Sequence, residues 1–319
     1  MQGLVIRSTG SWYEVQEITA SKEDLEDNLE SREIMKCRLK GKFKTKELKI
    51  TNPIAVGDKV IYEIENESEQ TGVITEILPR ENYIIRKSVH KTAHGQLIAS
   101  NLDQAMIIAT LTSPRTSLGF IDRFLVAAES FRIPAVVVFN KTDLLNEEGL
   151  IYQQELVEIY EKIGYECLQT STTENLNIDK FEFALKDKKT LLSGHSGVGK
   201  SSLVNALNPA LDIRTAEIST FANKGIHTTT FAQMFEIQRN SYIIDTPGIK
   251  ELGLMDISPT ELSHYFPEMR NFLNQCKYNN CLHTHERTCA VRDAVESGEI
   301  AECRYQSYLS MMENDDDRR

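Results

Sequence analysis

A glycine-rich loop at residues 194–201 has the residue types and spacing of a phosphate-binding loop. Its sequence, Gly-His-Ser-Gly-Val-Gly-Lys-Ser, fits the pattern G-x-x-x-x-G-K-[ST]. An apolar segment at 190–192 precedes it and a helical pattern at 202–207 follows. The glycines let backbone N–H groups turn toward phosphate oxygens, and the helix N-terminus adds its dipole. We therefore expect Lys200 to contact the β and γ phosphates of a nucleotide and Ser201 to bind Mg²⁺; a plain glycine-rich turn is the alternative.

A second motif, Asp-Thr-Pro-Gly at 245–248, follows the apolar segment 242–244. An acid at the end of such a strand can hold Mg²⁺, usually through water, while a following backbone N–H meets the γ phosphate. Asp245 and Gly248 are the candidates for these two roles. The motif begins 45 residues after Lys200, as a switch segment would, and this favours a functional motif over a simple turn.

The motif Asn-Lys-Thr-Asp at 140–143 closes the apolar segment 135–139 and indicates guanine as the base. Guanine presents N1–H and N2–H₂ as adjacent donors, and the carboxylate of Asp143 can accept hydrogen bonds from both. Adenine has no donor at N1, so it would leave one desolvated carboxylate oxygen unpaired. Asn140 is expected to bond the base or to tie the loop, and the stem of Lys141 to cover the face of the base.

A further loop at 169–172, Gln-Thr-Ser-Thr, also closes a predicted strand and is expected to reach the base through Ser171. The predicted nucleotide contacts thus come from two base-recognition loops, the phosphate loop and the acidic switch motif. They are Asn140, Lys141, Thr142, Asp143, Ser171, Gly194, His195, Ser196, Gly197, Val198, Gly199, Lys200, Ser201, Ser202, Asp245 and Gly248.

Hydrolysis needs a group that orients the attacking water, and many small GTPases use a Gln directly after the Asp-x-x-Gly motif. Here Ile249 occupies that place, and an aliphatic side chain cannot hold water. His227 is the predicted replacement; the alternative is that it only packs the switch. It stands beside Thr228 and Thr229, either of which could bind Mg²⁺ with Ser201 and Asp245. The predicted catalytic residues are His227, Lys200, Thr228 and Thr229, with slow intrinsic hydrolysis that a partner raises by ordering the switch.

The chain has six cysteines, and four of them lie in its last 44 residues. In a cytosolic protein such clustering suggests a metal site before disulfides. Cys276, Cys281, His283 and Cys289 form a Cys₃His set, which predicts one closed, structural Zn²⁺ site. His285 and Cys303 remain alternative fourth ligands.

Three zones of pattern organise the 319 residues. Short strands separated by turn residues fill residues 1–90 and predict a β-barrel. Strand and helix patterns alternate over 91–255 and predict a doubly wound α/β domain. Residues 256–319 are short, helical and cysteine-rich. The predicted strands are 3–6, 12–15, 35–40, 43–50, 59–64, 72–78, 104–111, 135–141, 165–171, 190–194, 231–237 and 241–245. The predicted helices are 121–131, 151–163 and 178–186.

Six basic residues between positions 36 and 46 all fall on even positions, while the apolar residues between them are odd. At a strand period of two this places the basic side chains on one face and the apolar ones inward. Such a face on a barrel could bind RNA; an ordinary solvated lysine face is the alternative. The residues of the predicted basic face are Lys36, Arg38, Lys40, Lys42, Lys44 and Lys46.

The net charge of −11 argues weakly against a general nucleic-acid binder. No apolar stretch approaches the roughly 18 residues of a membrane span, and the first 15 residues do not resemble a signal peptide. We expect a cytoplasmic monomer without a membrane association.

The order of the motifs is circularly permuted, because the base-recognition motifs precede the phosphate loop and the switches. With this order, the switch Lys-Gly-Ile-His-Thr-Thr-Thr at 224–230 and the cysteine pattern, the chain resembles the ribosome small-subunit-dependent GTPases (RsgA, also called YjeQ or YloQ) over nearly its whole length. The resemblance implies an OB-type barrel, GTP hydrolysis stimulated by the small ribosomal subunit, contact with its rRNA, and a role in late maturation of that subunit. Ile226 departs from the basic residue that many members carry there.

Two other classes of function stay open at the level of sequence. One is a GTP-sensing RNA-binding factor whose hydrolysis is incidental, which Ile249 mildly favours. The other is an ATPase or nucleotide kinase, against which Asn140 and Asp143 discriminate. Taken together, the motifs favour the hypothesis of an enzyme that converts GTP to GDP and phosphate with Mg²⁺.

Overall fold

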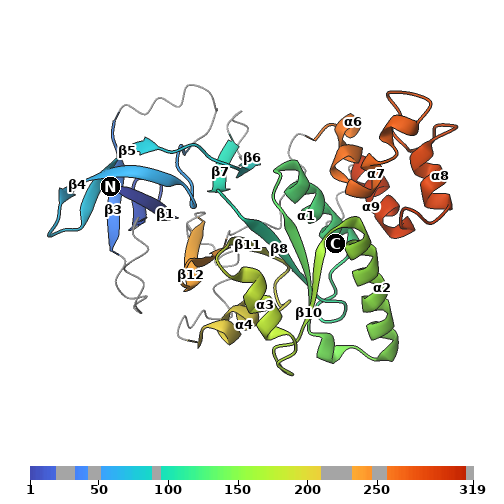
Figure 1. Cartoon of the computed structure of the whole chain (residues 1–319), viewed down its shortest axis with the longest axis horizontal. Coiled ribbons are helices and arrows are strands. Elements are labelled where there is room, and N and C mark those ends of the chain that lie inside the picture. The colour runs from blue at the N-terminus through green and yellow to red at the C-terminus, as the bar shows by residue number, and fades with distance from the viewer. Residues whose placement is uncertain (19–32, 42–51, 88–94, 210–231, 246–256, 314–319) are drawn as a thin grey trace, which may run out of the picture. The chain divides into compact units, whose positions relative to one another are not determined.

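The computed structural model describes residues 1–18, 33–41, 52–87, 95–209, 232–245 and 257–313 (Figure 1). The chain divides into two compact units. The first comprises residues 1–105, 178–193 and 200–249, and the second comprises 106–177, 194–199 and 250–319. Neither unit is one continuous stretch of sequence, so segments far apart in the chain pack together within each unit.

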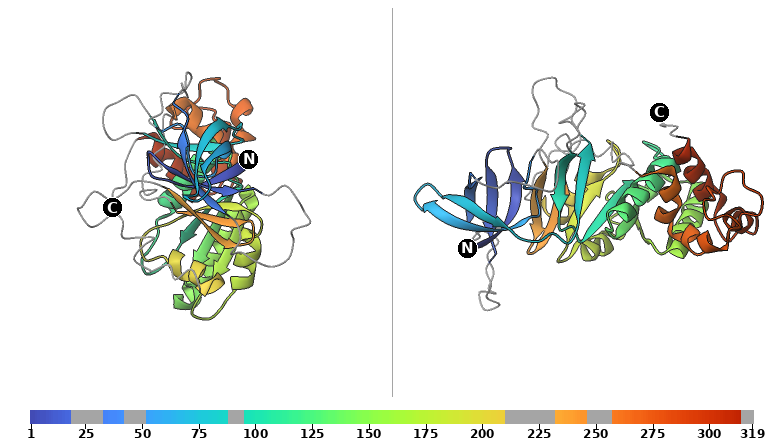
Figure 2. Two further views of the ribbon diagram at one scale, coloured as in Figure 1. Left: turned by 90° about the vertical axis from the view of Figure 1, so that its left-hand side faces the viewer. Right: turned by 90° about the horizontal axis from the view of Figure 1, so that it is seen from above.

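A five-stranded barrel forms the N-terminal part of the first unit (Figure 2). Its strands follow the order β1-β2-β3-β5-β4, and a pairing of β1 with β4 closes the ring. Neighbouring strands are antiparallel except β3 and β5, which are parallel. This closed five-stranded arrangement is that of an OB-type barrel. The strands are β1 Gln2–Ser8, β2 Tyr13–Glu17, β3 Ile34–Leu39, β4 Lys59–Asn66 and β5 Thr71–Ile77.

The alternation predicted for the basic strand is present in β3. Met35 and Cys37 are buried in the barrel core, whereas Lys36 and Arg38 point outward and are exposed. On this outer face Arg38 makes two hydrogen bonds to the carboxylate of Glu65, at 2.7 and 3.1 Å. Lys40 is also exposed, while Lys42, Lys44, Lys46 and the strand expected at 43–50 lie outside the described residues.

The first unit also contains an α/β part, and one of its strands pairs with a strand of the barrel. β11 (Lys189–Ser193) runs parallel to β13 (Ser241–Asp245), and β12 (Gln233–Gln238) lies antiparallel to β13. β12 also pairs with β1 of the barrel at Arg7 and Gln233. Helices α3 (Ile178–Leu185) and α4 (Lys200–Leu207) belong to the same unit.

A two-stranded sheet that the sequence patterns did not indicate is formed by β6 (Tyr83–Lys87) and β7 (Gly95–Ser100). The pairing buries Ile84 and Leu97. Each strand is short, and residues 88–94 between them carry no tight-turn signal, so the pattern gave no reason to pair them. The boundary expected near residue 90 falls between these two strands.

The second unit contains parallel strands and the two longest described helices of the chain. The strands follow the order β10-β9-β8, with β9 Ala135–Asn140, β10 Glu166–Thr170 and β8 Gln104–Ala109, which belongs to this unit from Met106 onward. Helix α1 (Leu118–Ser130) begins with Ser117, whose hydroxyl accepts a hydrogen bond from the backbone N–H of Phe120. Helix α2 (Glu147–Ile163) begins at the Asn146 cap and ends at Gly164, which has a positive φ of 111°.

Short helices form the C-terminal part of the second unit, as the sequence predicted. They are α6 Pro259–Leu262, η5 Ser263–Tyr265, α7 Pro267–Arg270, η6 Leu273–Gln275, α8 Ala290–Glu296 and α9 Glu302–Met312. Ser258 and Glu261, three positions apart in the sequence, form a capping box at the start of α6. Val126 of α1 belongs to the same apolar cluster as Phe266 and Tyr308, so these helices share a core with α1. Within the described ranges, no helix combines the length and apolar character that crossing a membrane requires.

Candidate nucleotide site and metal centre

The ends of two parallel strands bring the predicted base-recognition loops together. β9 and β10 are in register, with Thr170 opposite Asn140, so both strands end at the same edge. The Thr170 hydroxyl donates to the Asn140 side-chain oxygen at 2.9 Å, and the Asn140 amide donates to the carbonyl of Val198 at 2.8 Å. Of the two roles expected for Asn140, the described contacts provide the tie between loops.

Asp143 and Ser171 meet beside this tie. The Ser171 hydroxyl donates to Oδ1 of Asp143 at 2.5 Å and accepts from the backbone N–H of Glu174 at 3.1 Å. Lys141 adopts a left-handed backbone conformation with φ of 62°, and its ammonium donates to the carbonyl of Ser113 at 2.7 Å. The exposed carboxylate of Asp143 is therefore oriented by Ser171, and the ammonium of Lys141 is held by the carbonyl of Ser113.

The glycines of the loop 194–199 are required by close contacts. A Cβ added at Gly199 would lie 2.3 Å from Nδ2 of Asn140, and one at Gly194 would lie 2.4 Å from the carbonyl oxygen of Ile108. Both residues also have positive φ, as does Gly197. Any larger residue at Gly194 or Gly199 would displace the loop from its neighbours. The side chain of His195 stacks on Phe120 of α1, with ring centroids 3.9 Å apart and planes inclined by 27°.

The remaining predicted phosphate and magnesium ligands belong to the first unit. Lys200 and Ser201 are the first two residues of α4 and are both buried, and Ser202 follows them in the helix. Asp245 is the last residue of β13 and pairs with Gln233 of β12. The predicted residues His227, Thr228, Thr229 and Gly248 lie outside the described part of the chain.

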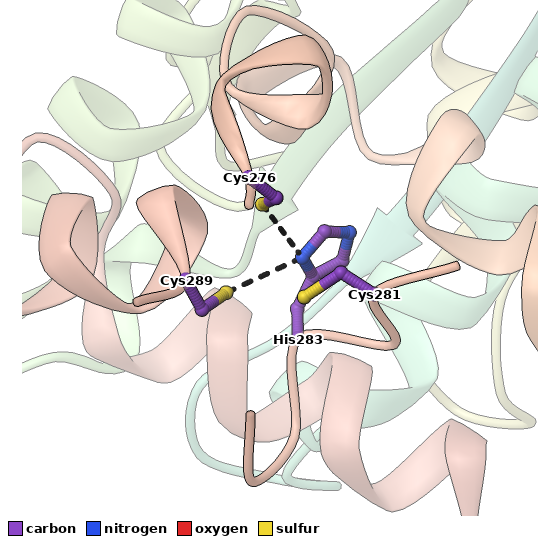
Figure 3. Close-up of side chains that lie close together, drawn as sticks. All are labelled: Cys276, Cys281, His283 and Cys289. Atoms are coloured by element: carbon purple, nitrogen blue, oxygen red, sulfur yellow. Dashed lines mark hydrogen bonds between the residues drawn. The ribbon is translucent and has the colours of Figure 1, made fainter. Parts of the chain in front are cut away.

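The four predicted metal ligands form one cluster (Figure 3). The ligand atoms of Cys276, Cys281, His283 and Cys289 all lie within 4.8 Å of one another. Nδ1 of His283 is 3.5 Å from Sγ of Cys276 and 3.4 Å from Sγ of Cys289. Donors held tetrahedrally at about 2.0–2.3 Å from one ion lie about 3.3–3.8 Å from each other. The donor set and its spacing therefore fit one tetrahedral ion such as Zn²⁺.

Neither alternative fourth ligand joins this cluster. His285 is exposed, and its Nδ1 contacts the Thr284 hydroxyl at 2.9 Å. Cys303 lies on α9 near Asp122 and Arg304 instead, and burial raises the pKa of its thiol. With His283 buried inside the cluster, the first of the predicted sets is the one that the fold assembles.

The ligand loop is supported by residues that sequence reasoning did not identify. The carboxylate of Glu286 accepts hydrogen bonds from the backbone N–H groups of Leu282, Thr284 and His285 at 2.7–3.2 Å. Burial alone would raise the pKa of Glu286, but these backbone donors outweigh it and lower the pKa to about 2. The hydroxyl of Tyr305 donates to the carbonyl of His283 at 2.6 Å.

A sequence signal for these supports exists only in part. Tyr305 and Tyr308 follow the cysteine cluster on a helical pattern, and the hydroxyl of Tyr308 donates to the carbonyl of Leu282 at 2.6 Å. Another residue that the sequence analysis did not single out is Arg304 of the same helix. It has helical spacing to Tyr308 and Met311, and a charged residue on an apolar helix face is a recognisable signal. Glu286 gave no such signal, because its partners are backbone groups that no side-chain pattern reveals.

Comparison with known proteins identifies the family. Residues 2–74 match the family described as the RsgA N-terminal domain, and residues 77–255 match the family described as RsgA GTPase. The second match alone covers more than half of the chain. The chain belongs to the RsgA GTPase family.

Full-length relatives and solved structures agree with this membership. The protein described as small ribosomal subunit biogenesis GTPase RsgA of Flavobacterium johnsoniae is 48% identical over 99% of this chain and 94% of its own length. The protein of the same description in Cytophaga hutchinsonii is 48% identical over 100% of both chains. These matches extend the family likeness beyond the barrel and the GTPase region to the C-terminal helices.

Two crystal structures have the same fold. YjeQ from Thermotoga maritima superimposes with a TM-score of 0.77 at 36% identity, covering 100% of this chain and 99% of that one. YloQ, described as a circularly permuted GTPase, superimposes with a TM-score of 0.73 at 29% identity, covering 100% and 96%. This RsgA-family chain is thus a circularly permuted P-loop GTPase with an N-terminal barrel, and its C-terminal helices carry a Cys₃His group that could bind a metal.

Proposed function

We propose that this GTPase hydrolyses GTP on the small ribosomal subunit, is stimulated by that subunit and acts in its late maturation. The names of its full-length relatives, small ribosomal subunit biogenesis GTPases, support the partner. A cytoplasmic location follows from this proposal, because ribosomal subunits are assembled there. The protein is proposed to act as a monomer.

The single observation that carries guanine specificity is the arrangement of Asp143 and Ser171 beside Asn140. Asp143 presents a carboxylate that the Ser171 hydroxyl already orients. Guanine N1–H and N2–H₂ are two parallel donors, and an ionised carboxylate has acceptor sites for both in addition to the serine. Since Asn140 binds the carbonyl of Val198 in the phosphate loop, placing the base also places the phosphates.

The phosphate end of the site is proposed to bind the triphosphate through the backbone of 194–199 and the ammonium of Lys200. Mg²⁺, when bound, neutralises developing charge on the β and γ phosphates. Ser201, Asp245 and one of Thr228 and Thr229 would hold it, and His227 would orient the attacking water. Gly248 would donate its N–H to the γ phosphate. A partner that orders the segment with His227 would raise turnover.

The Cys₃His cluster is proposed to hold one structural Zn²⁺ per chain. All four donors are protein atoms, so a tetrahedral ion leaves no position for substrate. Glu286, Tyr305 and Tyr308 fix the backbone of the ligand loop, which fits a site that stabilises the surrounding helices.

Contact with rRNA is proposed through the basic face of the barrel. Lys36, Arg38 and Lys40 are exposed on one side of β3 and its end, and Lys42, Lys44 and Lys46 follow them in sequence. The ion pair of Arg38 with Glu65 partly neutralises this face, so the lysines would supply most of the phosphate contacts. The proposed division into a barrel (1–90), a GTPase domain (91–255) and a C-terminal helical domain (256–319) assigns one task to each part.

The deciding experiment is GTP turnover by the purified protein with and without purified small ribosomal subunits. We expect a large stimulation by the small subunit, none by the large subunit and none with ATP as substrate. Substituting Lys36 and Lys40 together by Gln should weaken subunit binding and leave basal turnover unchanged. Tight GTP binding without stimulation by the small subunit would contradict the proposal and favour a GTP-sensing binding protein.

A further inference from the structure

A buried arginine joins the C-terminal helices to the first helix of the GTPase core. Arg304 of α9 has a fully buried guanidinium, which donates to Oδ1 of Asp122 in α1 at 2.6 Å. The same guanidinium donates to the carboxylate of Glu268 in α7 at 2.7 and 3.3 Å. Its charge therefore lies between two carboxylates from different segments, all within the second unit.

The surroundings of Arg304 fix its position from several sides. The hydroxyl of Tyr160 in α2 donates to Oδ1 of Asp122 at 2.8 Å, and the ring of Phe266 lies 4.8 Å from the guanidinium carbon. Burial by itself would lower the pKa of Arg304, but Asp122 and Glu268 hold it above its ordinary value. Oδ2 of Asp122 has no hydrogen-bond partner among the described residues, so losing the arginine would leave a buried carboxylate held by Tyr160 alone.

The other end of this connection is the phosphate loop. Phe120 lies two residues before Asp122, in the first turn of α1, and stacks on His195 of the loop. A stacked aromatic pair is favourable beyond the area that it buries. A rotation or shift of the N-terminal part of α1 would therefore change both the stacking of Phe120 on His195 and the ion pair of Asp122 with Arg304.

We propose that Arg304 is a positioning residue for the nucleotide site, which couples α9 to the phosphate loop through Asp122, α1 and the contact of Phe120 with His195. The coupling can also run from the metal cluster to the phosphate loop. Tyr305, the residue after Arg304 in α9, donates a hydrogen bond to the carbonyl of His283. Nucleotide binding and the order of the C-terminal helices are then linked, and each must favour the other by the same factor. The inference rests on nucleotide binding by the loop 194–201.

A second ion pair between the same two segments supplies a matched control. Arg270 of α7 pairs with Glu129, which is near the opposite end of α1 from Phe120. Both side chains of this pair are partly exposed to solvent. Arg270→Met therefore removes one arginine between the C-terminal helices and α1 without leaving a buried charge, whereas Arg304→Met removes the buried connection.

The test is hydrogen exchange of the full-length protein, followed by mass spectrometry over residues 302–312, with and without saturating GDP. GDP binding by each variant is measured in parallel by fluorescence titration. In wild type and in Arg270→Met we expect GDP to slow exchange in α9 by about fivefold or more, the lower range of coupling between linked sites. In Arg304→Met we expect weaker GDP binding and no GDP-dependent change in α9.

A second variant keeps the proposal testable if Arg304→Met fails to fold. Phe120→Leu leaves the arginine and both carboxylates in place, and removes only the stacking on His195. We expect its α9 to exchange as in unliganded wild type and to respond little to GDP. A wild type that binds GDP without slower exchange in α9, or an Arg304→Met or Phe120→Leu variant with the full response, would overturn the coupling. A wild type that binds no GDP would overturn the proposed nucleotide site, and the coupling with it.

Discussion

The hydroxyl of Ser171 lies 2.5 Å from Oδ1 of Asp143 and donates a hydrogen bond to it, although 28 positions separate the two residues in the chain. The contact exists because β9 and β10 are parallel and end level with each other. It orients the carboxylate before any nucleotide arrives, so little side-chain freedom remains to be lost on binding.

Replacing Asp143 by Asn should change which base the site prefers. The asparagine amide presents a donor where guanine N2–H₂ needs an acceptor, while xanthine has a carbonyl at that position. We expect GTP affinity to fall roughly ten- to a hundredfold, the worth of one charge-assisted hydrogen bond, and XTP affinity to rise. Competitive titration with a fluorescent guanine nucleotide measures both. Glu147→Gln, the same kind of change at an exposed position nearby, should alter neither, and unchanged GTP affinity in Asp143→Asn would refute the assigned role.

Ser171→Ala should weaken GTP binding less than Asp143→Asn does. The variant keeps the carboxylate but removes the donor that orients it, at a cost of about 1 kcal/mol, or about fivefold in affinity. The same titration gives the value. Ser171→Ala also removes the acceptor of the Glu174 backbone N–H. Ser171→Thr keeps a hydroxyl, so it is the control expected to retain most of the affinity.

His227→Ala should lower GTP turnover by roughly a hundredfold in the presence of small ribosomal subunits, the lower range for a group that handles the reacting water. Nucleotide affinity should stay within about twofold, since no contact with the base or loop is assigned to this residue. Single-turnover hydrolysis separates the two quantities. His264→Ala, an exposed histidine in the C-terminal helices, is the control. Unchanged turnover would mean that His227 only packs the switch.

Metal affinity should rise steeply with pH. Burial raises the pKa of the Cys281 thiol to about 12 and also raises that of Cys289, so both carry a proton in the metal-free protein near neutral pH. Thiolates are the ligands, so binding releases these protons, and affinity gains up to about tenfold per pH unit for each. Burial lowers the pKa of His283, which is therefore already neutral above about pH 6.5. Zinc competition with a chelator between about pH 6 and pH 8 tests this, and a flat profile would exclude ligation by these thiols.

Glu286→Gln should loosen the metal site without removing a ligand. The neutral amide is a poorer acceptor for the three backbone N–H groups that the carboxylate binds, so the ligand loop loses its fixed shape. We expect zinc affinity to fall about ten- to a hundredfold, as for other residues that support metal ligands. Chelator competition measures it, with the exposed Glu296→Gln as control. Equal affinities in the two variants would show that Glu286 does not support the site.

The sequence by itself determined the features whose residues are neighbours in the chain. The phosphate loop, the Asn-Lys-Thr-Asp motif and the Cys₃His set each lie within 14 residues or fewer, so local spacing is enough to recognise their chemistry. The alternation of buried and exposed side chains in β3 was predictable for the same reason. The strand period of two places Met35 and Cys37 on one face, independently of how the other strands are arranged. The capping box at Ser258 is likewise a matter of four consecutive residues.

Only the tertiary structure decided the contacts between distant segments. Asn140 reaches Val198 across 58 positions, and Arg304 reaches Asp122 across 182, because strand order and helix packing bring them together. Cys303 and His285 were excluded from the metal cluster in the same way, by where the helix and the loop point rather than by residue type. The type of a residue determines which bonds its side chain can form. Which of those bonds form depends on the packing of the whole chain, since burial and distance are properties of the fold.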